Sequence, residues 1–371
     1  MIANAGFWGI ILSAGKRNRI LLSGPGLIGK RHVELLEQSE RSDLVAIVAP
    51  NHDHNTVFCN DHRVPMFNSM QEALDATEID GAIIASPNAV HTEQALFCIE
   101  RGIPVFVEKP LAVTLQEGAM ICAAAKKYKV PVLVGHHRTY SSYLSSAKEF
   151  IESDIFGDLV AVRGSALFRK PEHYFEEGLW RSQPGGGPIL INLIHDIGIL
   201  RYLCGEIAAV SAYSSSERRK FAVEDTVAVT IIFENGALGT FILSDIAASN
   251  RSWEMTSGEN KAYPRFSDAD CYHFAGTRGS LDFPTMRARY YKPEDAPSWW
   301  TPFDMEVLET SGSDPLAKQL AHFEDVIAGK SEPLVSAEDG LANMRVLEAV
   351  ILASKSGSVV NIDSIPIDIE N

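Results

Sequence analysis

The 371-residue sequence predicts an α/β protein built from two domains. The first is a doubly wound parallel sheet, because short β-branched apolar runs alternate with segments of helical period up to residue 135. The second is an α+β domain with a large, mainly antiparallel open sheet, because the runs after Arg138 are longer and fewer helices separate them. An Asn-Gly pair between two of these runs is typical of a β-hairpin.

The first domain is expected to span residues 19–138, after a loose extension over residues 1–18. Its strands are nearly all apolar, as strands covered on both faces should be, and are expected at residues 19–23, 44–49, 81–85, 104–107 and 132–135. Helices are expected between them, at about residues 26–38, 70–76, 89–101 and 114–128.

The second domain is expected to span residues 139–371. A helix at about 140–153 precedes long strands at 158–168, 207–216, 226–234 and 237–246. Asn235 and Gly236 lie between the last two strands, where a tight hairpin turn needs a positive φ at both positions. Short strands are expected within 247–315. Two late helices, which are expected to pack back on the first domain, lie at about 314–328 and 336–356.

The chain is acidic, with 48 Asp and Glu residues against 33 Lys and Arg residues and a net charge of −15. This charge opposes binding to nucleic acids or anionic membranes, because attraction to phosphate needs concentrated positive charge. No apolar run approaches the roughly 18 to 20 residues of a membrane span. Five widely spaced cysteines without a CxxC pair indicate reduced thiols. We therefore expect a cytoplasmic protein with a small-molecule partner.

A glycine pattern follows the first apolar run and begins the first predicted helix. It consists of Gly24, Gly26 and Gly29, with Leu27 and Ile28 between the last two glycines. In the Rossmann dinucleotide fold, the first glycine makes a tight turn, the second admits the pyrophosphate, and the third packs the helix on the strand. The helix N-terminus offers free N–H groups to the phosphates. The strand before the pattern and the helix after it predict NAD(P) binding.

The end of the second strand bears on the choice between NAD and NADP. Ala49 stands where an acidic residue usually binds the ribose of NAD, so nothing there repels a 2′-phosphate. Asn51 and His52 could donate hydrogen bonds to such a phosphate. Alternatively, this loop is solvated and other contacts hold NAD. We expect NAD(P) with a slight preference for NADP. We expect no metal, because the run from His52 to His54 has too few ligands.

Polar residues follow several strands at their carboxyl ends, where ligands bind in open α/β sheets. Cofactor contacts are therefore also expected from Ser86, Pro87, Asn88, His91, Glu108 and Lys109. Asn192 and His195 would share a face of a later helix, whereas Asp196 would point about 100° away. An imidazole with a pKa of about 6.5 suits a general base, and a lysine ammonium can stabilise an alkoxide.

These residues resemble the Gfo/Idh/MocA family, which includes glucose-fructose oxidoreductase, inositol dehydrogenase and the rhizopine-catabolism protein. The resemblance covers residues 19–360 and rests on the glycine pattern, the Glu108-Lys109-Pro110 triplet, and a glycine run followed by His195-Asp196. It implies an N-terminal dinucleotide domain, a C-terminal domain with a large open sheet, and NAD(P)-dependent activity on sugars and cyclic polyols. It also implies that Lys109 and His195 are the catalytic pair.

One position departs from that family. Many members carry an aspartate one helical turn before the histidine, where this chain has Ile191, and Asn192 would replace part of its hydrogen bonding. The segment up to His195 is similar to a branch that includes dehydrogenases of cyclic cis-diol carboxylates. Substrate contacts are expected from His137, Arg138, Trp180, Arg181, Asn192 and Asp196.

Several cations precede the glycine run at Gly185, namely Arg163, Arg169, Lys170 and Arg181. They would bind a substrate carboxylate, with Arg181 as the leading candidate, or else form ordinary surface ion pairs. The expected reaction is hydride transfer between NAD(P) and a secondary alcohol of a sugar, cyclic polyol or cyclic hydroxy acid. The alternatives are a non-catalytic NAD(P)-binding sensor, and a hydrolase or lyase that oxidises its substrate transiently.

The alternation along residues 226–233 predicts how the chain assembles. Val227, Val229, Ile231 and Phe233 would face one side of the sheet, and Thr226, Ala228, Thr230 and Ile232 the other. The late helices and the first domain can cover only part of such a sheet. The open face would then pair with a second copy, which predicts a homodimer or a tetramer of dimers.

Overall fold

The computed structural model describes residues 17–367, so the predicted extension over residues 1–18 lies almost entirely outside the described residues. The N-terminal sheet has six parallel strands in the order β3-β2-β1-β4-β5-β6. Their bounds are β1 Asn18–Ser23, β2 Ser42–Val48, β3 Met66–Phe67, β4 Gly81–Ile84, β5 Val105–Val107 and β6 Val132–Val134. The predicted doubly wound parallel sheet is therefore confirmed, with β3 as a short additional edge strand.

The helices of this half are α1 Leu27–Gln38, α2 Asp53–Asp61, α3 Met70–Ala76, α4 His91–Ile99 and α5 Leu115–Tyr128. Two of them differ from the prediction. Helix α2 occupies a segment that we expected to be a loop. The helix has little amphipathic character, and of its residues only Asn55 and Cys59 are buried. The segment from residue 88 begins with a 3₁₀ turn, Asn88–Val90, and α4 starts only at His91.

The second sheet has nine strands in the order β14-β13-β12-β11-β7-β10-β9-β8-β15. Its pairs are antiparallel except β7 with β10, which agrees with the predicted mainly antiparallel sheet. The strands are β7 Leu159–Leu167, β8 Ile207–Ser215, β9 Thr226–Phe233, β10 Leu238–Ser244, β11 Tyr272–Gly276, β12 Gly279–Phe283, β13 Arg287–Tyr290, β14 Asp304–Val307 and β15 Val360–Asn361.

The Asn-Gly hairpin joins β9 and β10, as predicted, but its turn is not the two-residue turn that we expected. Of Asn235 and Gly236, only Gly236 has a positive φ, +87°. The Gly236 N–H donates to the Phe233 carbonyl over 3.0 Å, and the Phe233 N–H donates to the Ala237 carbonyl over 3.0 Å. The connection is therefore a three-residue loop that ends on a left-handed glycine, which is the next most common hairpin geometry.

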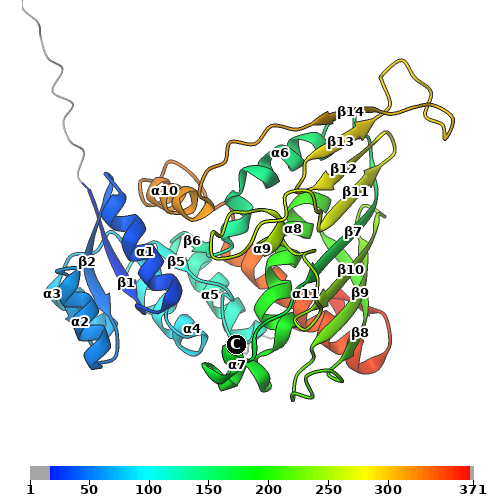
Figure 1. Cartoon of the computed structure of the whole chain (residues 1–371). Helices are drawn as coiled ribbons and strands as arrows, with labels where there is room; N and C mark the ends of the chain where they lie inside the picture. The colour runs from blue at the N-terminus through cyan, green and yellow to red at the C-terminus, as the bar shows by residue number, and fades with distance from the viewer. Residues whose placement is uncertain (1–16, 368–371) are drawn as a thin grey trace, which may run out of the picture.

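The helices of the second half are α6 Ser142–Ile151, α7 Glu172–Glu176, α8 Ile194–Cys204, α9 Trp253–Thr256, α10 Pro315–Ile327 and α11 Ala337–Ser356. A π-helical turn, Ile189–Leu193, leads directly into α8. Helices α8, α9 and α11 lie between the two sheets (Figure 1). Helix α11 contacts helix α5 and strand β6 of the first half, and strand β8 of the second sheet. Helix α10 packs on α1. Helices α10 and α11 therefore connect the two halves of the chain.

Strand β9 shows how the nine-stranded sheet is covered. Val227, Val229, Ile231 and Phe233 are buried, whereas Ala228, Thr230 and Ile232 are exposed and Thr226 is half-buried. In Figure 1, no helix of the described chain covers the outer face of the sheet. That face also carries Tyr213, Leu238 and Ile242, all of which are exposed.

Candidate active site

The glycine-rich turn is shaped so that only glycines fit two of its positions. Gly24 has a φ of +87°, and a Cβ there would lie 2.5 Å from the backbone of Ser86. A Cβ at Gly29 would lie 2.0 Å from the carbonyl oxygen of Gly24. Gly26 caps α1 without a side-chain hydrogen bond, and nothing lies within 4 Å of its missing Cβ.

The open space at Gly26 lies at the start of α1, where Leu27 is 94% exposed. Ile28 packs on the hydrophobic core that contains Ile20 and Leu22 of β1. The first N–H groups of a helix have no partner within the helix, and they carry the positive end of its dipole. Backbone N–H groups in front of open space are suited to a pyrophosphate. These residues therefore fit the phosphates of a dinucleotide cofactor.

The end of β2 lacks a carboxylate that could bind the ribose of NAD. Ala49 is buried, and Asn51 and His52 after it are exposed. The first acidic residue is Asp53, which opens α2. Asn51 accepts a weak hydrogen bond from Thr56 over 3.4 Å, so its amide nitrogen is free to donate.

The loop after β4 contains Ser86, Pro87 and Asn88, of which Asn88 lines a cavity that also reaches Lys109. Ser86 Oγ donates to Gln94 over 2.8 Å. His91 is buried, and its Nδ1 and Nε2 each lie 2.9 Å from a carbonyl oxygen, of Pro110 and Ser86 respectively. Both ring nitrogens are therefore engaged by the backbone. His91 therefore lies between the loop after β4 and the loop after β5, and both of its ring nitrogens are near backbone carbonyls.

Glu108 and Lys109 follow β5 and have different environments. Glu108 is buried and lies 2.8 Å from Nε2 of His32 on α1. Burial opposes ionisation of Glu108, but the hydrogen bond and the charge of His32 outweigh it, so its pKa is lowered. Lys109 Nζ donates to the carbonyl of Ile191 over 3.4 Å. Burial lowers the pKa of Lys109, although the charge of Glu108 acts in the opposite direction.

Three histidines meet between the domains, and none of them has a carboxylate partner in residues 17–367. The ring of His195 lies 5.4 Å from that of His137 and 6.2 Å from that of His136. His136 Nε2 accepts from the Asn343 amide over 3.2 Å. Buried Nδ1 of His195 has no hydrogen-bond partner among the described residues. Burial and the charge of Lys109 hold the pKa of His195 well below 6.5, so the ring is neutral at pH 7.

Two residues that we predicted to bind substrate, Arg138 and Asp196, form an ion pair with each other. Both are buried, and Arg138 Nη1 lies 3.3 Å from Asp196 Oδ1. Asp196 also accepts from the hydroxyl of Tyr272, and Arg138 donates to Glu254 over 2.5 Å. Burial raises the pKa of Asp196 to about 7 in spite of the charge of Arg138. This network anchors α8 to η2, the 3₁₀ turn His137–Tyr140, and to the sheet.

The cations that precede Gly185 do not act as one group. Arg181 is turned back on its own segment, where it donates to the Tyr174 carbonyl and stacks 4.0 Å from the Tyr174 ring. Arg163 lies on the outer face of the sheet. Lys170, in contrast, is buried and donates to Asn192 Oδ1, just before α8, over 2.7 Å. The sequence singled out Lys170 as one of these cations, but it offered no local signal for His32 or Tyr272 at this site.

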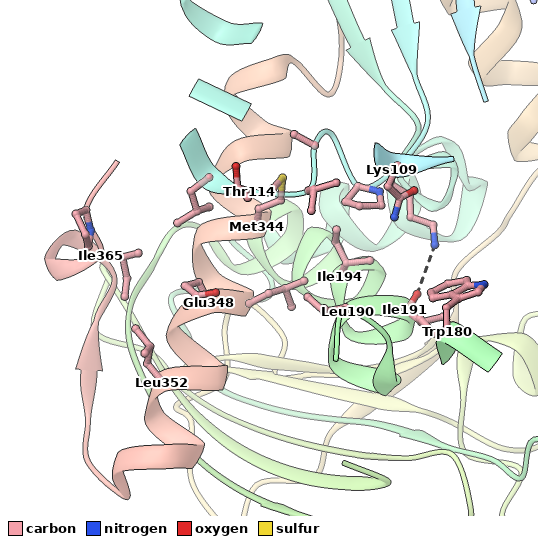
Figure 2. A pocket seen from close by; sticks show the side chains of 18 residues that line it. Lys109, Thr114, Trp180, Leu190, Ile191, Ile194, Met344, Glu348, Leu352 and Ile365 are labelled. Atoms are coloured by element: carbon pink, nitrogen blue, oxygen red, sulfur yellow. Dashed lines mark hydrogen bonds between the residues drawn. The ribbon is translucent and has the colours of Figure 1, made fainter. Parts of the chain in front are cut away.

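A cavity of about 610 Å³ begins beside Lys109 (Figure 2). Trp180, the Ile191 backbone and Lys109 meet at one end, and the cavity continues past Leu190, Ile194 and Met344 toward Leu352 and Ile365. The predicted spacing of Asn192 and His195 on one face assumed a regular helix. The π-helical turn through Asn192 alters that register before α8 begins.

The part of the chain that the structure describes has neither a cluster of metal ligands nor a membrane-spanning helix. No group of three or more His, Cys, Asp or Glu side chains could hold a metal ion there. None of the described helices has the length and apolar character to cross a membrane.

Comparison with known proteins agrees with this architecture. Residues 18–136 match the model of an oxidoreductase family with an NAD-binding Rossmann fold, and residues 144–282 match the GFO/IDH/MocA C-terminal domain. The 1,5-anhydro-D-fructose reductase of Ensifer adhaerens is 23% identical over 94% of this chain and 99% of its own length. The NAD-dependent scyllo-inositol 2-dehydrogenase of Bacillus subtilis is 26% identical over 79% of this chain and 80% of its own.

A solved structure has the same fold along nearly the whole chain. The WlbA dehydrogenase of Bordetella pertussis, in complex with NADH and UDP-GlcNAcA, gives a TM-score of 0.75 at 22% identity over 95% of this chain and all of its own. Both domain models cover this chain, and each half of the structure has the corresponding sheet. The chain belongs to the Gfo/Idh/MocA family of NAD-binding oxidoreductases.

Proposed function

We propose that this oxidoreductase transfers a hydride between NAD(P) and a secondary alcohol of a sugar, a cyclic polyol or a cyclic hydroxy acid. The observation that carries the proposal is the position of Lys109, which lines the cavity and contacts the turn that leads into α8, whose second residue is the neutral His195. Lys109 donates to the carbonyl of Ile191, four residues before His195, and its charge lowers the pKa of His195. A cation and a neutral imidazole are what the oxidation of an alcohol needs.

Each residue would have a separate role. His195 accepts the hydroxyl proton, because its pKa keeps the ring unprotonated at neutral pH. Lys109 holds the same oxygen as an ammonium and stabilises the negative charge that develops on it. His137, whose ring packs against His195, contacts the substrate from the same side. A bound nicotinamide supplies the hydride chemistry, which belongs to the cofactor.

The cofactor would be held by Gly24, Gly26 and the first turn of α1, with further contacts from Ser86, Pro87 and Asn88. NADP would bind at least as well as NAD. This preference is supported by the neutral Ala49 at the end of β2 and by the exposed donors Asn51 and His52 after it.

We further propose that the open face of the nine-stranded sheet pairs with a second copy, which gives a homodimer or a tetramer of dimers. The exposed Tyr213, Leu238 and Ile242 on that face support this assembly. The cysteines of the described residues are all free thiols, and four of the five are buried. Free thiols support a reducing, cytoplasmic location.

The direct test is a screen of sugars, cyclic polyols and hydroxy acids with NAD and with NADP, followed at 340 nm. A net change in absorbance that depends on substrate is expected. A non-catalytic sensor would give no change with any substrate. A hydrolase or lyase that regenerates its cofactor would convert substrate without a net change, and either result would contradict the proposal.

A further inference from the structure

Two lysine side chains from different segments meet the π-helical turn just before α8. Lys109 Nζ donates to the Ile191 carbonyl over 3.4 Å, and Lys170 Nζ donates to Asn192 Oδ1 over 2.7 Å. The two contacts are made with consecutive residues of the turn, one with a backbone carbonyl and the other with a side chain. Lys170 is also enclosed by the Tyr174 ring, 4.9 Å from its Nζ.

The contact with Lys170 decides how the Asn192 amide is oriented. An ammonium can only donate hydrogen bonds, so the atom that faces it must be the amide oxygen. The Asn192 Nδ2 group therefore points away from Lys170 with two N–H donors. Within residues 17–367, Nδ2 makes no hydrogen bond, and Asn192 is half-buried. The turn thus presents the N–H donors of Asn192 near the Lys170 ammonium.

The carboxylates around the site are already engaged elsewhere. Asp245 lies 2.7 Å from Arg219 and only 3.7 Å from Lys170, so it neutralises Lys170 in part. The other carboxylates have partners of their own: Glu108 with His32, Asp196 with Arg138 and Tyr272, Glu254 with Arg138, and Glu224 with the Ile189 N–H. Ile191 stands in the turn without any acceptor on its side chain. Among the described residues, none of these carboxylates makes a hydrogen bond with Asn192 Nδ2.

A pair of neighbouring donors, the Lys170 ammonium and the Asn192 Nδ2 group, discriminates between substrate groups. A hydroxyl placed there needs an acceptor for its own proton, and a buried donor without an acceptor is costly. A carboxylate can accept hydrogen bonds from both donors, and its negative charge offsets the positive charge of Lys170. We propose that Lys170 and Asn192 bind a carboxylate of the substrate, at the turn whose Ile191 carbonyl accepts from Lys109. The substrate class is then a carboxylated sugar or cyclic hydroxy acid; this inference rests on the proposed function.

The test compares neutral and carboxylated partners with the full chain at pH 7, where Lys170 is mostly protonated because burial lowers its pKa only to about 8. The pairs are D-glucose with D-glucuronate, D-galactose with D-galacturonate, and myo-inositol with quinate. Turnover is followed at 340 nm, and binding to the NADPH-loaded protein by calorimetry. We expect at least one acid to exceed its neutral partner about 100-fold in kcat/KM and in affinity.

Two variants locate the effect. Asn192→Asp keeps an acceptor for Lys170 but replaces the donor group by a carboxylate oxygen, so the preference for the acid should fall about 100-fold and the neutral partner should gain. Lys170→Met should raise KM for the acid more than it lowers kcat. Lys292→Met is the matched control, because that lysine is half-exposed and pairs with Asp304 away from the site. Cofactor affinity serves as the check on folding in each variant.

The outcomes separate this inference from the proposed function. Turnover of neutral partners as fast as or faster than the acids would overturn the carboxylate site and keep the oxidoreductase assignment. Tighter binding of acids without turnover would support the carboxylate site and count against the proposed reaction. Equal binding of acids and neutral partners, or an acid preference that survives Asn192→Asp, would overturn the inference.

Discussion

Nε2 of His32 lies 2.8 Å from Oε1 of Glu108, and both side chains are nearly enclosed by protein, with exposed fractions of 1% and 9%. His32 belongs to α1, the helix that follows the glycine-rich turn, whereas Glu108 directly precedes Lys109. This contact joins the two ends of the proposed site, one for the cofactor phosphates and one for the reacting oxygen. The contact also stabilises the ionised form of Glu108, which burial alone would disfavour.

The first prediction concerns this buried pair. His32→Leu should lower the free energy of unfolding by about 3 to 5 kcal/mol, because it leaves the Glu108 carboxylate buried without a partner. The double variant His32→Leu/Glu108→Leu should lose less than the sum of the two single changes, since no charge remains. Urea denaturation of the four proteins measures the cycle. Additive losses would mean that the two side chains do not interact.

The second prediction concerns the cofactor. The chain should bind NADP as tightly as NAD or more tightly. Ala49→Asp should shift the preference toward NAD, because a carboxylate repels the 2′-phosphate and accepts from the ribose hydroxyls. Ala49 is buried, so Asn51→Asp, at an exposed position, is the second variant that adds charge with less risk to folding. Titration of both cofactors into each protein decides the matter, and a strong wild-type preference for NAD would contradict the prediction.

The third prediction concerns the pH dependence of alcohol oxidation. His195 must be unprotonated to act as a base, and burial together with the charge of Lys109 lowers its pKa. The rate should therefore rise with pH along a limb that lies below pH 6.5. Lys109 must be protonated, and burial lowers its pKa as well, so the rate should fall again below pH 10.5.

The profile of kcat/KM against pH, with saturating cofactor, measures both limbs. Lys109→Arg should move the alkaline limb to higher pH, because a guanidinium stays charged. An acid limb centred at or above pH 6.5 would show that His195 is not the base in a buried neutral state.

The fourth prediction concerns assembly. Light scattering at micromolar concentration should give a mass of at least twice 40.6 kDa. Leu238→Lys combined with Ile242→Lys should shift the protein toward the monomer, because both side chains are exposed on the open face of the sheet. Val57→Lys is the matched control, since Val57 is equally exposed but lies on α2 of the other domain. A monomer in the unmodified protein would contradict the assembly through this face.

The sequence predicted the elements whose pattern is local. The strands at the centre of both sheets were found from apolar runs, and the turn at Gly24 from its spacing, because each signal lies within one segment. Helix α2 was missed, since the short segment around Asn55 buries little and has a weak apolar stripe.

The site was predicted less completely, because its contacts join distant segments. Arg138 and Asp196 read as free polar residues in the sequence, but 58 residues apart they form a buried pair. The partnership of Lys170 with Asn192, 22 residues away, depends on a π-helical turn that leaves no periodic signal. Only the folded structure shows which charged side chains already have partners.

The most direct test of the central claim measures turnover and cofactor affinity together in Lys109→Ala and His195→Ala. With the best substrate from the screen, each variant should lose at least about 100-fold in kcat, because a charge-stabilising cation or a general base is removed. The dissociation constant for NADPH, measured by fluorescence titration, should stay within about threefold of the unmodified value, since both side chains act at the reacting oxygen. A parallel loss of cofactor affinity and turnover would contradict the account and make the two residues structural.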